Sequence, residues 1–125
     1  MEEDMTLYML HEGDQWLSRD SLVCMGVFDL EHLDGACENL IRERADELFR
    51  EHLNENGYDG KSLLRYCNDN CIDREKGESK EHLYNRLLDE FVDGLKEELL
   101  NNSQTQGYST NFYINPITLN EYGEI

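Results

Sequence analysis

The sequence predicts an α+β domain: a three-stranded antiparallel sheet, in the order β-β-α-α-β, with two long helices packed on one face. Two observations predict this fold. Short apolar segments rich in β-forming residues lie near both ends of the chain, and two long amphipathic segments lie between them. At 125 residues, the chain fits a single domain over residues 1–125.

Two strands are predicted within residues 5–28, in the apolar runs 5–10 and 22–28. Each run is too short for a stable helix and ends in turn or charge signals. We interpret them as neighbouring antiparallel strands, and because both carry apolar groups on both faces, we expect both to lie inside the sheet. The loop between them holds the only tryptophan, Trp16, which we expect to fold back onto the sheet edge or a helix.

Two long helices are predicted over residues 30–55 and 79–101. In each, apolar residues recur in steps of three and four, which marks one buried face. Asp29 is placed as the N-cap of the first helix and Ser79 as that of the second. Residues 58–78 are interpreted as a connector with one or two helical turns.

The third strand is predicted over residues 111–122. Its apolar alternation shifts by one position at Asn115-Pro116, which favours a β-bulge at the proline. Because proline cannot donate a hydrogen bond to a neighbouring strand, we expect this strand to lie at a sheet edge.

The cysteines predict reduced thiols and no metal site. None of the four forms a C-x-x-C pair, and Cys24 and Cys37 fall at apolar positions typical of a core. Cys67 and Cys71 are four residues apart, which would place both on one face of a helix. A zinc site would need two more ligands, and His82 is the only nearby imidazole. We therefore expect neither a metal nor a cofactor.

Catalytic motifs give no support for an enzyme. The chain has no phosphate-binding P-loop, no dinucleotide-binding glycine motif, no hydrolase serine motif and no metalloprotease histidine pair. His11 and Ser21 are a conceivable base and nucleophile, but nothing in the sequence brings them together. We expect a protein that is not an enzyme.

The net charge restricts the class of partner. The chain has 28 acidic and 11 basic residues, a formal charge of -17. Such acidity argues against direct binding to nucleic acid, because phosphates must be neutralised by Lys and Arg. A partner selected by charge would be basic. The acidic start of the chain is unlike a signal peptide and no run is long enough to cross a membrane, so we expect a cytoplasmic protein.

Acidic residues recur at every fourth position along both predicted helices. The first row is Glu43, Glu47, Glu51 and Glu55, and the second row is Asp89, Asp93 and Glu97. Like charges at this spacing cost about 0.2 to 0.5 kcal/mol each, and only a few acidic residues have an arginine four positions later. The carboxylates advance about 6 Å per step, a sparse analogue of nucleic-acid phosphates. Our hypothesis is that the rows occupy the nucleic-acid site of a basic protein; the alternative is two solvated helix faces.

The two ends of the chain resemble small acidic proteins of phages and mobile elements of gut bacteria. At the first end it is carried by Tyr8-x-Leu10-x-Glu12-x-Asp14-x-Trp16-x-Ser18-x-Asp20-Ser21 and Gly26-Val27-Phe28. At the second end it is carried by Thr105-Gln106-Gly107, Asn111 and Tyr113. Residues 58–78 have no counterpart in it. The resemblance implies an inhibitor of host defence, of the anti-CRISPR or antirestriction kind, with a CRISPR nuclease as the first candidate target. No catalytic residue is carried over.

A packing-driven interaction module is the alternative. In that case the protein would be a plain binding module or a homodimer without nucleic-acid mimicry, using exposed aromatic residues. The candidates are Trp16, Tyr108, Phe112 and Tyr113. Such binding should be insensitive to salt, whereas binding through the acidic rows should weaken steeply as salt rises.

Overall fold

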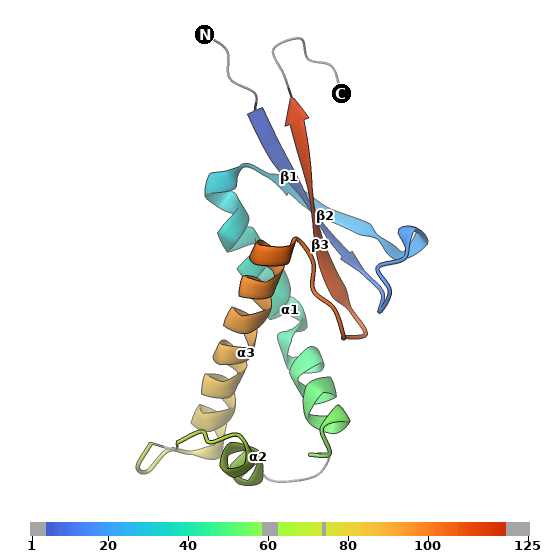
Figure 1. The fold of residues 1–125 in the computed structure, drawn as a ribbon. Helices are drawn as coiled ribbons and strands as arrows, with labels where there is room; N and C mark the ends of the chain where they lie inside the picture. The colour runs from blue at the N-terminus through green and yellow to red at the C-terminus, as the bar shows by residue number, and fades with distance from the viewer. Residues whose placement is uncertain (1–4, 59–62, 74, 120–125) are drawn as a thin grey trace.

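A computed structural model describes residues 5–58, 63–73 and 75–119. Its elements, in chain order, are β1 (Met5–Gly13), a 3-10 turn (Arg19–Ser21), β2 (Val23–Phe28), α1 (Leu30–Glu55), α2 (Leu63–Asp69), α3 (Lys80–Asn102) and β3 (Asn111–Leu119). Figure 1 shows α1 and α3 as an antiparallel pair on one side of the sheet, with α2 at their far end. The predicted α+β fold is confirmed.

Both predicted N-caps are present. The Asp29 carboxylate accepts a hydrogen bond from the His32 backbone N–H at 3.0 Å, and the Ser79 hydroxyl accepts one from the His82 N–H at 3.1 Å. These bonds satisfy backbone donors that have no partner inside the helix. The observed α1 covers residues 30–55 as predicted, and α3 begins and ends one residue later than predicted.

The sheet has the order β2-β1-β3, with β1 paired antiparallel to both neighbours. The predicted pairing of the first two strands and the edge position of β3 are confirmed. The prediction that β2 lies inside the sheet is wrong: of the three described strands, only β1 lies between two others. Beyond β3, an isolated bridge joins Tyr113 to Gln104. Val23 and Val27, which lie on opposite faces of β2, are both exposed. Apolar side chains on both faces of a strand therefore do not show that the strand has a neighbour on each side.

The predicted bulge at Pro116 is wrong. The β1–β3 register is unbroken from one end to the other, and Pro116 pairs with Tyr8. The apolar pattern shifts because Ile114 is buried against the helices while Ile117, beside Leu7, lies on the opposite face of the sheet. An edge strand tolerates the missing proline N–H. The register shift in this sheet lies between β1 and β2, at Leu10 and His11.

The main core lies between the helix pair and one face of the sheet. Leu10 of β1 and Phe112 and Ile114 of β3 are buried there against α1 and α3. A second buried cluster joins the other end of the helix pair to α2, and its members are Phe49, Cys67, Leu83 and Leu87. No helix in the described ranges is both long and apolar enough to cross a membrane.

The cysteines divide into two buried and two exposed thiols. Cys37 is buried as predicted, and burial raises the pKa of its thiol to about 11. The prediction that Cys24 is a core residue is wrong, because it pairs with His11 on the sheet face away from the helices and is exposed. Cys67 is buried and Cys71 is exposed. Because α2 ends at Asp69 and Cys71 has a φ of 57°, the two thiols do not share a helix face.

Candidate binding surfaces

The loop that carries Trp16 is fixed by Asp14. The Asp14 carboxylate accepts hydrogen bonds from the Trp16 and Ser18 backbone N–H groups, both at 3.0 Å, and from the Ser18 hydroxyl at 2.6 Å. These bonds hold the pKa of Asp14 below its ordinary value, and the bond from the Ser18 hydroxyl has the largest effect. Leu17 has a φ of 51°, in the left-handed region that is uncommon for leucine. The loop is therefore a specific turn.

Asn111 ties this loop to the segment that precedes β3. Its side chain is buried and donates to the backbone carbonyls of Gln15 at 3.2 Å and Tyr108 at 2.8 Å. Its side-chain oxygen accepts from the Thr105 hydroxyl at 3.1 Å, and Thr105 is also buried. Two loops about 90 residues apart in sequence are thus joined by one amide, a link that the sequence pattern does not reveal.

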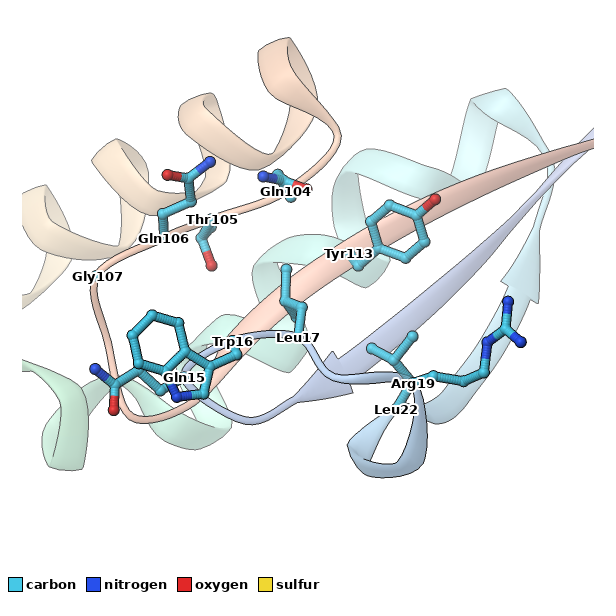
Figure 2. Close-up of a pocket in the computed structure, with 10 residues that line it drawn as sticks. All are labelled: Gln15, Trp16, Leu17, Arg19, Leu22, Gln104, Thr105, Gln106, Gly107 and Tyr113. Atoms are coloured by element: carbon cyan, nitrogen blue, oxygen red, sulfur yellow. The ribbon is translucent and has the colours of Figure 1, made fainter.

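Trp16 projects from this loop and is 79% exposed. The prediction that it folds back onto the sheet edge or a helix is wrong, because hydrogen bonds to Asp14 and Asn111 fix the loop without the indole. Trp16 helps to line a pocket of about 580 Å³. Figure 2 shows its side chain beside those of the segment before β3. The pocket is lined by Gln15, Trp16, Leu17, Arg19, Leu22, Gln104, Thr105, Gln106, Gly107 and Tyr113. No carboxylate is among them.

Among the residues that the structure describes, the sheet face away from the helices also carries no carboxylate. Leu10 is buried in the core and Glu12 binds Arg44 of α1, so both side chains of β1 point toward the helices. Because successive side chains of a strand point to opposite faces, the residues between and beside them in β1 face away from the helices. Cross-strand partners share a face, so the register completes the set. This surface, which we name the neutral face, consists of Leu7, Met9, His11, Cys24, Val27, Tyr113, Asn115 and Ile117.

The neutral face continues into the pocket through Tyr113, which belongs to both. The Tyr113 ring lies against His11, with the ring centroids 5.9 Å apart. The His11 Nδ1 atom is buried and has no hydrogen-bond partner among the described residues. Among the described residues, the neutral face and the pocket thus form one continuous surface without carboxylates, and Arg19 of the pocket carries a charge on it.

The first acidic row runs along the sheet side of α1. Glu43 lies in a small groove beside Met25 and Phe28 of β2. Glu51 is half-buried and accepts a hydrogen bond from the Ser109 backbone N–H at 3.1 Å, so it anchors the loop before β3. The other three residues of this row are exposed: Glu43, Glu47 and Glu55. The row is therefore not a continuous line of free carboxylates.

The second row borders the seam between α1 and α3. Asp89 binds Arg42 of α1 at 2.9 Å, while Asp93 and Glu97 are exposed. The structure does not align this row with the first, because Asp89 faces α1 whereas Glu43 faces β2.

Most basic residues of the long helices are engaged by carboxylates of the same chain. Arg44 binds Glu12, and Lys96 binds both Asp34 and Glu38. Arg42, Arg50 and Arg86 also bind carboxylates. Within the described residues, Glu43, Glu47, Asp93 and Glu97 have no ion-pair partner. The ion pairs of the described residues therefore leave part of the negative charge on this side of the molecule without a basic partner.

The groups considered for catalysis or metal binding have structural roles. The Ser21 hydroxyl accepts from the Asp14 N–H at 3.0 Å and donates to the Ser18 carbonyl at 2.8 Å. Two groups of described residues could bring three metal ligands together: Asp29, Glu31 and His32, and Glu75, Glu78 and His82. Asp29 is the cap of α1, and the Glu78 carboxylate is bound by Arg86. The cysteines belong to neither group.

No protein-family model, curated protein or solved structure matches this chain. Its function must therefore be inferred from two surfaces of opposite character. One is the helical side, which carries unpaired carboxylates. The other is the neutral face with the adjoining Trp16 loop and pocket. Both surfaces are suited to binding another macromolecule.

Proposed function

We propose that this chain is a non-catalytic inhibitor that binds a basic, nucleic-acid-binding protein through its acidic helical side. In this proposal it blocks the nucleic-acid site of a host-defence enzyme. An RNA-guided CRISPR nuclease is the first candidate, on the strength of the resemblance at the two chain ends. The observation that carries the proposal is the unequal use of charge on α1 and α3. Arg42, Arg50 and Lys96 are held in internal ion pairs, while Glu43, Glu47, Asp93 and Glu97 have no ion-pair partner among the described residues.

The carboxylates assigned to the partner are fewer than the two rows contain. Glu51 anchors the loop before β3 and Asp89 binds Arg42, so each already has a partner within the chain. The proposed contacts are Glu43 and Glu47 on α1, Asp93 and Glu97 on α3, and Glu55 at the end of α1. Lys and Arg lining a nucleic-acid groove would supply the opposite charge, and the attraction would be screened by salt.

The test is capture of host proteins on the immobilised chain at about 0.1 M salt, followed by elution at about 0.5 M. We expect a nucleic-acid-binding enzyme to elute, and we expect Glu43→Lys/Glu47→Lys to abolish its capture. The matched control is Asp20→Lys/Glu75→Lys, which changes net charge equally at exposed positions outside the long helices. If both double variants lose capture alike, or neither does, the helical site is wrong.

A packing-driven module without mimicry is the second candidate, favoured by the exposure of Trp16 on a fixed loop beside a pocket. Tryptophan is enriched among the residues that contribute most of the binding energy at protein interfaces. The same capture experiment separates the two candidates. Binding that survives high salt and is lost in Trp16→Ala would identify the pocket as the binding site, and the acidic side as solvated surface.

A further inference from the structure

We propose that the neutral face is a self-association surface, through which two copies of this chain pack reversibly, sheet against sheet. This inference goes beyond the proposed function, because it uses the opposite side of the molecule from the acidic helices. It also assigns a role to side chains that the inhibitor proposal leaves unused.

The first argument is the segregation of charge. Charged residues make up 31% of the chain, yet none of the eight residues of the neutral face is Asp, Glu, Lys or Arg. Val27 at its edge is 50% exposed, and Leu7, Met9 and Ile117 are only half-buried. No other described element covers these residues. An apolar surface without charge would gain free energy by being removed from water.

The second argument concerns the occupant. A basic protein or a nucleic acid would find no charge of either sign on this face. A second copy offers the same apolar surface, and a two-fold axis pairs such a patch with itself. Each copy carries a formal charge of -17, so close contact between helical sides would be strongly repulsive. Packing through the sheets leaves both helical layers, and their carboxylates, on the outside of the dimer.

The third argument is area. The nine residues of β1 extend about 30 Å, and three strands are about 14 Å wide, which gives a projected area of about 400 Å². The Trp16 loop and its pocket lie at the end of this area and enlarge it. The surface that each copy could bury is therefore no larger than the roughly 800 Å² per partner of a standard stable interface. We therefore expect a reversible dimer, with the sheets about 10 Å apart.

Salt should affect this dimer and the proposed partner complex in opposite directions. Screening weakens the attraction between the acidic helices and a basic partner. It also weakens the repulsion between two copies of this chain, so self-association should strengthen as salt rises. A failure of one proposal is therefore distinguishable from a failure of the other.

The experiment is sedimentation velocity over a range of protein concentrations at about 0.05 M and about 0.5 M salt. We expect a monomer–dimer equilibrium that shifts toward dimer at the higher salt. Val27→Lys should weaken association by roughly tenfold or more, because it places a charge in the apolar contact. The control is Val23→Lys on the same strand. Val23 is 56% exposed but pairs with Glu12, on the other face of the sheet.

A second readout uses the unaltered protein. Cys24 lies on the neutral face and Cys71 lies outside it, and both thiols are exposed. Alkylation of Cys24, relative to Cys71, should slow as concentration and salt increase. A monomer under all conditions, equal disruption by the two lysine variants, or an unchanged ratio of alkylation rates would each overturn the proposal.

Discussion

Glu78 is a buried carboxylate just before α3, and its partners explain why it is ionised there. Arg86 binds both of its oxygens, at 2.9 and 3.0 Å, and His82 Nδ1 lies 2.6 Å from one of them. The hydrogen bonds from Arg86 are the main cause that lowers the pKa of Glu78 to about 2, against the opposing effect of burial. One arginine thus holds the connector against the first turns of α3.

We expect Glu78 to make the protein sensitive to acid. Because its pKa in the folded state is below its ordinary value of 4.5, its stabilising contribution is present above about pH 4.5 and is lost as pH falls toward 2. The free energy of unfolding by urea, compared between the natural protein and Glu78→Gln, should differ more at pH 7 than at about pH 3. Glu81→Gln, an exposed control in the first turn of α3, should show no such trend; a difference independent of pH for Glu78→Gln would contradict this account.

Among the elements, the helices could be predicted from the sequence and the details of the sheet could not. The limits of α1 depend on local signals, a capping side chain and the spacing of apolar residues, which are adjacent in sequence. The edge position of β2, the regular register at Pro116 and the exposure of Trp16 depend on pairings with distant residues. Asn111 shows why such details cannot be predicted. Its side chain donates a hydrogen bond to the Gln15 carbonyl, and no residue near it in sequence indicates this.

The caps of the long helices can be tested individually. Ser79→Ala removes the acceptor for the His82 N–H and should lower the free energy of unfolding by about 1 kcal/mol. Ser79→Asp keeps an acceptor and places a negative charge at the helix N-terminus, so it should retain the natural stability or exceed it. Urea unfolding of the three proteins is the measurement. Equal losses in both variants would show that the hydroxyl bond is not the stabilising contact.

At the scale of the whole molecule, the described residues place carboxylates without ion-pair partners on the helical side and no Asp, Glu, Lys or Arg on the neutral face. The sequence identified the excess of acidic residues and the two rows, but it could not show which carboxylates are already engaged. Glu51 and Asp89 have partners within the chain because the fold brings Ser109 and Arg42 to them across long sequence distances. The neutral face likewise emerges only from strand register. The proposed functions follow from this separation of surfaces.

Competition on a captured target tests the central claim of nucleic-acid mimicry most directly. The measurement is the affinity of the purified target for a labelled nucleic acid at increasing concentrations of this protein. The account predicts that the apparent dissociation constant for the nucleic acid rises in proportion to the concentration of the protein, and that excess nucleic acid displaces the protein. A stable complex that contains target, nucleic acid and this protein together, with the affinity for nucleic acid unchanged, would contradict it.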